Sequence, residues 1–329
     1  MVGPMPIRSN FFSLAFALLA FATIVIACGN AAPAGDYPSR PIHLIVPYAA
    51  GGAADSVARV LAKRIGKSAG LTIVVENRGG GGSIIGTEFV NKSDPDGYSL
   101  LLGQSGPISI NPAVYKNLPY DPLKDFAPIS LTTSYPYIMV VNPTLGVKTV
   151  KEFVKPGELN YGTTGVGAAN HLVTELFDGK AGIRMTHIPY RGTALAVSDL
   201  LAGQVQVVFA DPISALQHVK SGTLVALAVT SKERSPAAPA VPTISESGYP
   251  GFDAVGWHGI LAPAKTPPAI IARLNAEIVE ALSDPETKAL LESQAMQVVG
   301  SSPEAFAGFI KRDIAIWKEV ADQARIEVR

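Results

Sequence analysis

The sequence is short of residues on which many chemistries depend. Its 329 residues include one cysteine and five histidines. Because Cys28 is the single cysteine, no disulfide within the chain is possible, and stability must come from buried apolar side chains. The histidines lie apart, without the i, i+4 pairing of a zinc helix, so we expect no metal site. No Gly-x-Ser-x-Gly motif occurs and no activated nucleophile is evident, which argues against an enzyme.

An excess of charge of one sign is also missing. The chain balances 27 basic against 27 acidic residues, and its isoelectric point is near 7.0. This excludes the basic surface that nucleic-acid-binding proteins and proteins bound to anionic membranes carry. Hydrophobic residues make up 47% of the chain, which is enough for a large core. Roughly 300 residues beyond an N-terminal leader suggest two domains.

The N-terminus is predicted to direct export. Arg8 is followed by an apolar run, Phe11 to Ala27, as in a secretory signal peptide. Val25-Ile26-Ala27-Cys28 fits a bacterial lipobox, in which Cys28 becomes a lipidated first residue. A small-residue cleavage site at Ala34 is the alternative. We therefore treat residues 1–35 as a leader and tether, and expect a periplasmic protein with either a lipid anchor at Cys28 or none.

The most informative stretch joins a strand to a helix through small residues. Ile42 to Val46 is a short apolar run typical of a buried strand, and Tyr48 to Ala54 is a loop of mostly glycine and alanine. Val57, Leu61 and Ile65 then form the apolar stripe of a helix. The first amides of such a helix attract an anion without help from lysine or arginine. The alternative is that the glycines only turn the chain.

Strands and helices alternate along the rest of the chain, which predicts an α/β fold with parallel sheets covered by helices. Ligands of such sheets bind beyond the carboxyl ends of the strands. The expected strands are 42–46, 71–76, 98–102, 127–131, 137–142, 159–162, 185–188, 205–209, 224–229 and 257–261. The expected helices are one that Ser83 caps and that ends near residue 91, then 170–177, 193–201, 213–220, 269–282 and 303–325.

Several segments, in this order, carry a family resemblance: VPYAAGGAADSVAR, VVENRGGGGSIIGTEFV, NYGTTGVGAANHLVTELF, HIPYRG and WHGILAP. From about Tyr37 to Ala324 the sequence resembles the substrate-binding proteins of tripartite tricarboxylate transporters, also called Bug receptors. The resemblance implies a two-lobed α/β periplasmic-binding-protein architecture of the Venus flytrap, type II-like kind. Lobe 1 would hold residues 36–130 and 256–329, lobe 2 residues 131–255, with a ligand cleft between them.

The resemblance also implies a function. Such a receptor captures a small carboxylate and delivers it to the membrane permease subunits of the transporter, without a cofactor, nucleic acid or membrane contact other than an anchor. Two alternatives remain open on the residues alone. A secreted α/β hydrolase would be recognised by its hydrolytic activity on esters and amides. A sensor subunit that presents ligand to a membrane kinase has the same sequence features as a transport receptor.

Ligand-contacting residues follow from matching positions. In lobe 1 they are Ala50, Gly51, Ala53 and Asp55 of the carboxylate loop, with Gln104 and Ser105 at the end of a later strand. In lobe 2 they are Thr163, Thr164, Gly165 and Gly167, which a turn could also use. Tyr48 stands where the family most often has phenylalanine. It either adds a hydroxyl beside the cleft or packs with its hydroxyl in solvent.

Three charged or titratable residues have two readings each. His171 lies near a helix start, where the helix dipole disfavours its cation, so we expect it to be neutral and to donate either to the ligand or to a loop carbonyl. Arg191 either counters a second carboxylate or forms a salt bridge at the rim. Asp211 repels a carboxylate, so it either accepts from a ligand donor or water, or caps the helix after Pro212.

Two segments depart from simple expectations. The spacing Gly80-x-Gly82-x₃-Gly86 is not the dinucleotide fingerprint, and we expect this loop to be mobile or tightly packed beside the cleft. The segment from Thr149 to Asn160 is shorter than is usual in the family. Its helix is expected to have only about two turns.

Overall fold

The computed structural model describes residues 1–3, 37–154 and 157–324. The predicted leader with Cys28 lies outside the described residues. The chain divides into two units, Met1–Tyr37 and Pro38–Arg329, and the fold below is that of the second. Within the described ranges, none of the helices combines the length and the apolar character that crossing a bilayer requires.

The first of two sheets has six strands in the order β11-β4-β10-β3-β1-β2. Its strands are β1 (Ile42–Val46), β2 (Ile73–Asn77), β3 (Ser99–Gln104), β4 (Phe126–Pro136), β10 (Val255–Pro263) and β11 (Gln297–Val298). β1 runs parallel to β2 and β3, whereas β10 pairs antiparallel with β3 and β4. β4 stays paired with β10 as far as Pro136, so the expected lobe boundary after residue 130 falls inside this strand.

The second sheet has five strands in the order β7-β6-β8-β5-β9. Its strands are β5 (Ile138–Val141), β6 (Asn160–Thr163), β7 (Thr186–Pro189), β8 (Val207–Ala210) and β9 (Val225–Val229). β6 is parallel to β7 and β8, but β5 is antiparallel to β8 and β9. The expected α/β fold is confirmed, and each sheet is mixed, with antiparallel pairs beside the parallel strands. β4 passes into β5 through Tyr137 alone and so carries the chain from the first sheet into the second.

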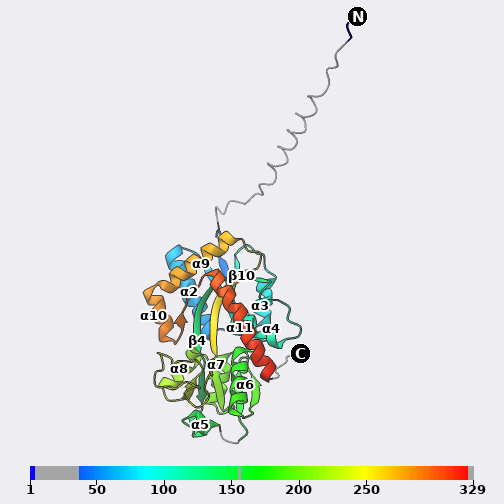
Figure 1. The fold of residues 1–329 in the computed structure, drawn as a ribbon. Coiled ribbons are helices and arrows are strands. Elements are labelled where there is room, and N and C mark those ends of the chain that lie inside the picture. Colours follow the sequence, from blue (N-terminus) through cyan, green and yellow to red (C-terminus); the bar gives the residue numbers. More distant parts are fainter. Residues whose placement is uncertain (4–36, 155–156, 325–329) are drawn as a thin grey trace. The chain divides into compact units, whose positions relative to one another are not determined.

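Helices surround both sheets. Those whose sequences flank the first sheet are α2 (Ala53–Ala69), α3 (Ile84–Asn91), α4 (Asn111–Val114), α9 (Pro268–Ser283), α10 (Pro285–Ser293) and α11 (Pro303–Ala324). Those of the second are α5 (Val150–Phe153), α6 (Ala169–Ala181), α7 (Thr193–Leu201) and α8 (Pro212–Lys220). α9 and α11 pack on β4, and Figure 1 shows α11 running beside β4 and β10. Trp257 of β10 and Phe306 of α11 meet edge to face in the first core, with ring centroids 5.5 Å apart.

Local structure corrects two expectations. Ser83 does not cap α3: its φ is 72° and its side chain makes no capping hydrogen bond. Its carbonyl oxygen instead accepts from the Thr87 hydroxyl. The helix expected to have two turns after Thr149 is a single turn, α5, which the Thr149 hydroxyl caps by accepting from the Glu152 amide. Neither α10 nor a π-helical turn at Gly106–Ile110 was expected.

Candidate functional site: a cavity at three helix N-termini

A cavity of about 270 Å³ is lined by loops that follow strands of both sheets. The lining residues contributed by the first sheet and its connections are Tyr48, Ala49, Ala50, Gly52, Ala53, Ala54, Gln104, Tyr135 and Tyr137. Those from the second sheet are Thr164, Ala169, Asn170, Gly192, Thr193, Ala194, Leu195 and Asp211. The carboxyl ends of strands in both sheets therefore contribute to one site.

Three helices begin at this cavity. The first residues of α2, α6 and α7 line it, and their N-cap residues, Gly52, Ala168 and Gly192, make no side-chain capping hydrogen bond. The first N–H groups of a helix have no partner within the helix, and its dipole places partial positive charge there. The cavity therefore combines free amide donors with three favourable dipoles, which suits an anion.

The charged groups around the cavity are few. No lysine, arginine or histidine is among its lining residues, and Asp211 is the one carboxylate there. The Asp211 carboxylate accepts hydrogen bonds from the Ser214 amide and hydroxyl, both at 3.0 Å, and so caps α8. Burial raises the pKa of Asp211 above its usual value. The capping reading of Asp211 is thus realised, while its carboxylate also borders the cavity.

Two tyrosines that the sequence reasoning missed also line the cavity. Tyr135 and Tyr137 flank Pro136, the last residue of β4, and their rings meet edge to face at 5.4 Å. Tyr135 also stacks on His258 at 4.9 Å. Burial raises the pKa of both phenols, so each contributes an uncharged side chain to the cavity lining at pH 7. The signal that could have found them is the Tyr-Pro-Tyr run at the passage between the sheets.

Tyr48 lines this cavity as well, and its hydroxyl is buried and not in solvent. Its ring is largely buried, and burial raises the pKa of its hydroxyl to about 12. The other predicted residues that line the first cavity are Ala50, Ala53, Gln104, Thr164 and Asp211. Ser105 is buried next to Gln104 and is not among the lining residues.

Asp55 stabilises the loop of residues 48–54, the predicted carboxylate-binding loop, through a hydrogen bond. Its carboxylate accepts from the Gly51 amide at 3.1 Å and from the Arg59 side chain at 2.9–3.1 Å. Although burial alone would raise the pKa of Asp55, hydrogen bonds from Arg59 and Gly51 lower it overall. Gly51 itself has a φ of 92°, a conformation that favours glycine. Both residues shape the loop without lining the first cavity.

A second cavity of about 200 Å³ shares Tyr48 and Thr164 with the first. Its remaining lining residues are Pro47, Gly80, Gly81, Gly82, Ser83, Gly165, Pro189, Tyr190 and Arg191. Two predicted site residues, Gly165 and Arg191, therefore lie here and not in the first cavity. Arg191 brings to it the only cationic side chain among the residues that line either cavity.

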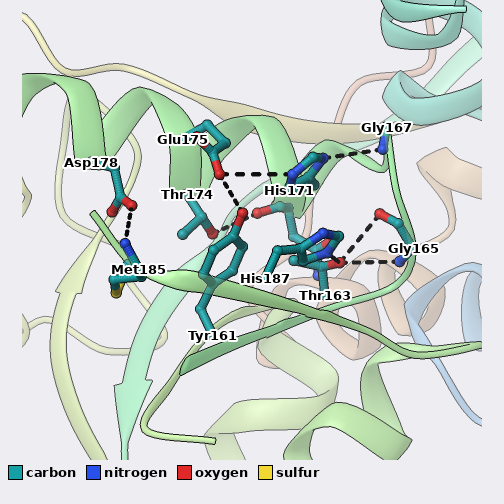
Figure 2. Close-up of polar contacts among 11 residues, drawn as sticks. Tyr161, Thr163, Gly165, Gly167, His171, Thr174, Glu175, Asp178, Met185 and His187 are labelled. Atoms are coloured by element: carbon teal, nitrogen blue, oxygen red, sulfur yellow. Dashed lines mark hydrogen bonds and ion pairs between the residues drawn. The ribbon is translucent and has the colours of Figure 1, made fainter. Parts of the chain in front are cut away.

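Among the remaining predicted residues, Thr163 and Gly167 belong to the loop at the end of β6, and His171 of α6 contacts that loop (Figure 2). His171 accepts a hydrogen bond from the Gly167 amide at 3.1 Å, so its partner is a loop amide and not the expected carbonyl. Burial lowers the pKa of His171 to about 4, which confirms the expected neutral state. The cause is burial, whereas the helix dipole was the reason anticipated.

The sequence profile "Tripartite tricarboxylate transporter family receptor" matches residues 57–326. The chain is 40% identical to protein BugT of Bordetella pertussis over 324 residues, which cover 95% of this chain and 98% of BugT. It is 36% identical to the periplasmic binding protein BugD, with a TM-score of 0.85 over 89% of this chain and 100% of BugD.

Two further solved structures contain ligands. One is an R. palustris protein with adipate, at 33% identity and a TM-score of 0.85 over 89% of this chain and 99% of the other. The second is MatC from Rhodopseudomonas palustris with bound malate, at 30% identity and a TM-score of 0.83 over 86% and 99%. Profile, identity and coverage agree: the chain belongs to the tripartite tricarboxylate transporter receptor family, the solute receptors that include the Bug proteins.

Proposed function

We propose that this protein is an extracytoplasmic receptor that captures a small carboxylate in the first cavity and delivers it to a tripartite tricarboxylate transporter. The observation that carries the proposal is the convergence of three uncapped helix N-termini on one cavity that no lysine or arginine lines. Backbone amides and helix dipoles bind an anion without a counter-ion. Adipate and malate in two relatives of this fold are carboxylates of the expected size.

The ligand that fits best is a dicarboxylate. One carboxylate would be bound at the starts of α2, α6 and α7, where Ala50, Ala53 and Thr164 lie. The second cavity, reached past Tyr48 and Thr164, offers Arg191 to another anionic group. Asp211 would disfavour a second carboxylate close to the first and would accept from a ligand hydroxyl. We therefore expect the two acidic groups of the ligand to lie well apart.

The two sheets would act as two lobes. The expected division is residues 36–130 and 256–329 for lobe 1 and residues 131–255 for lobe 2; because β4 stays paired with β10 as far as Pro136, we move the first boundary to the β4–β5 connection at Tyr137. The β4–β5 and β9–β10 connections would then serve as the hinge, since each joins strands of different sheets. Closure of the lobes on the ligand would bring the amides of α2 toward those of α6 and α7.

Location and partners follow from the same assignment. The receptor would work in the periplasm and hand its ligand to the membrane permease subunits of the transporter, with no catalytic role of its own. Its leader, residues 1–35, would direct export, and Cys28 would provide a lipid anchor if the lipobox is used.

The experiment is a thermal-shift screen of the mature protein, followed by calorimetric titration. A ligand at 100 times its Kd adds about 2.7 kcal/mol of stability. Adipate or malate should stabilise the protein, whereas NAD and ATP should not. Stabilisation by nucleotides alone, or by no carboxylate at all, would refute the proposal.

A matched pair of ligands tests the role of Arg191. Adipate and hexanoate have the same chain length but differ in the second carboxylate. The substitution Arg191→Gln should weaken adipate by about tenfold or more, in the range of a charged hydrogen bond, and leave hexanoate unchanged. Equal effects on both ligands would remove Arg191 from the site.

A further inference from the structure

Two histidines stack behind the ligand loop of the second sheet. His171 lies in α6 and His187 in β7, and their rings are nearly parallel with centroids 4.1 Å apart (Figure 2). Tyr161 of β6 lies nearly parallel to both rings, with centroids 5.1 Å from His187 and 6.2 Å from His171. This three-ring stack lies against residues 163–167, the loop that contributes Thr164 to the first cavity and Thr164 and Gly165 to the second.

His171 contacts the loop through one ring nitrogen. The Gly167 amide donates to its Nδ1 at 3.1 Å, so Nδ1 must carry a lone pair. The proton of the neutral ring is then on Nε2, which faces the Glu175 carboxylate at 3.8 Å. The Glu175 carboxylate also accepts from the Tyr161 hydroxyl, which holds it on this side of the stack. Only the neutral Nε2–H tautomer of His171 satisfies these contacts.

His187 reaches the same loop through Thr163. Its Nε2 lies 2.6 Å from the Thr163 hydroxyl oxygen. That oxygen also accepts from the Gly165 amide at 3.1 Å, and its hydroxyl donates to the Gly165 carbonyl at 3.2 Å. When the hydroxyl gives its one proton to the Gly165 carbonyl, the proton between Thr163 and His187 is on the histidine ring. Thr163 thereby closes a tight turn whose geometry His187 supports.

We propose that His171 and His187 are positioning residues: the neutral, stacked pair holds the loop 163–167 in its ligand-binding shape, and protonation of the pair releases that loop. This inference rests on the proposed function, because it assigns the loop to ligand capture. Thr164 links the loop to the cavity directly, since its amide and hydroxyl both donate to the Asn170 side chain, and both residues line the first cavity.

Protonation would act through one contact and one repulsion. A proton on His171 Nδ1 would point at the Gly167 N–H, so the hydrogen bond would be lost. Two imidazolium rings 4.1 Å apart would also repel each other. The Glu175 carboxylate opposes this loss because its negative charge favours a protonated histidine. Asp178 does not favour it in the same way: its carboxyl oxygen accepts from the Met185 amide, and burial raises its pKa to about 7, so it is largely uncharged at acidic pH. Burial lowers the pKa of each histidine to about 4.

The loop is therefore expected to be intact at neutral pH and to loosen as the pH approaches 4. Three variants separate the roles of the rings. His171→Phe keeps a stacked ring but removes the acceptor. His171→Asn keeps an acceptor near the Nδ1 position, and the double substitution His171→Asn with His187→Gln removes both titrating groups. His43→Asn, at a histidine of β1 that pairs with Glu76, is the control.

The primary measurement is amide hydrogen exchange of peptides covering residues 163–170, without ligand and corrected for the intrinsic effect of pH. At pH 7.5 His171→Phe should exchange at Gly167 at least tenfold faster than the wild type, while His171→Asn and the control should match the wild type. Between pH 6 and 4 the wild type should lose protection, and the double variant should keep it. Equal protection in His171→Phe and wild type, or the same pH profile in the double variant, would overturn the inference.

Adipate titration of the same proteins is the second readout. Affinity should fall by about tenfold in His171→Phe and should follow loop protection across pH in the wild type. If adipate and malate bind to no variant and not to the wild type at any pH, the proposed function fails. The exchange data still decide whether the histidines hold the loop.

Discussion

The hydroxyl of Tyr115 donates a hydrogen bond to the carbonyl oxygen of Val166 at 3.0 Å. Tyr115 directly follows α4, whereas Val166 lies in the loop after β6 of the second sheet, so the bond joins segments that belong to different sheets. The Tyr115 side chain also leaves no room for a larger residue at two glycine positions. A Cβ added at Gly82 would lie 2.7 Å from its hydroxyl, and one at Gly167 would lie 2.9 Å from its ring. Tyr115 therefore connects the Gly-rich loop, residues 79–82, with the loop 163–167. We call this connection the latch.

Removal of this latch should weaken ligand binding. Tyr115→Phe keeps the ring that packs on both glycines but loses the bond to Val166. A single neutral hydrogen bond contributes about 0.5–1.5 kcal/mol, so affinity for adipate should fall by about two- to tenfold. Calorimetric titration measures this, with Tyr249→Phe as the control because Tyr249 lines neither cavity. An unchanged affinity would show that the latch does not favour the bound form.

Gly52 offers the cleanest steric test of the first cavity. It lines the cavity, its φ of −92° and ψ of −178° suit any residue, and an added Cβ meets no atom within 4 Å. Gly52→Val should therefore fill ligand space without straining the backbone. We expect ligand stabilisation to disappear while the melting temperature without ligand stays within a few degrees of the wild type.

The control for that test is Gly157→Val, at an exposed glycine that also has open space around it and lines neither cavity. It should bind as the wild type does. If Gly52→Val retains wild-type affinity, the carboxylate is bound elsewhere, and the starts of the three helices are not its site.

Sequence reasoning found the parts of the site that are encoded locally. The apolar run 42–46 and the helix 193–201 have the bounds that were expected, because their hydrophobic periods are complete within a few residues. The family resemblance then pointed to Ala50, Ala53 and Thr164 in the small-residue loops after strands, and these residues do line the cavity. The starts of α6 and α7 carry a further local signal for an anion site, since neither has a serine or aspartate as its N-cap.

What the sequence did not reveal depends on long-range pairing. The register that sets Gln104 opposite His258 is a match between strands about 150 residues apart, and β10 runs antiparallel to β3 there. Tyr135 lines the cavity with its ring stacked on that same His258. Gly51 and Asp55 shape the loop without lining the first cavity. This outcome depends on the direction of the Asp55 side chain, which a motif does not specify.

The anchor hypothesis makes a separate prediction. If the lipobox Val25 to Cys28 is used, Cys28 carries acyl chains and the protein partitions with membranes, because two or more chains anchor a protein stably where one does not. Cys28→Ser should then release the protein to the soluble fraction or stall its processing. The intact mass of the mature protein decides: an unmodified N-terminus after Ala34 would show that Cys28 is removed with the leader.

Buried histidines should make the fold itself sensitive to acid. His258 is fully buried, its Nδ1 is 2.9 Å from the Thr133 hydroxyl, and burial lowers its pKa to about 3 from an ordinary value of 6.5. Between these two values the unfolded chain binds a proton that the folded chain does not. The free energy of unfolding therefore falls as the pH decreases through this window, by about 1.4 kcal/mol per pH unit for one histidine. Below about pH 3 both states are protonated and the loss levels off.

A substitution isolates this contribution. Asp178 acts in the opposite direction, because its raised pKa makes the folded state bind the extra proton, so the total slope of the wild type is not diagnostic. His258→Gln removes the titrating ring and should flatten the slope of unfolding free energy between pH 6 and 4 by about one proton. Urea denaturation at a series of pH values measures the slope. If His258→Gln has the wild-type slope, His258 is not the group whose protonation opposes folding.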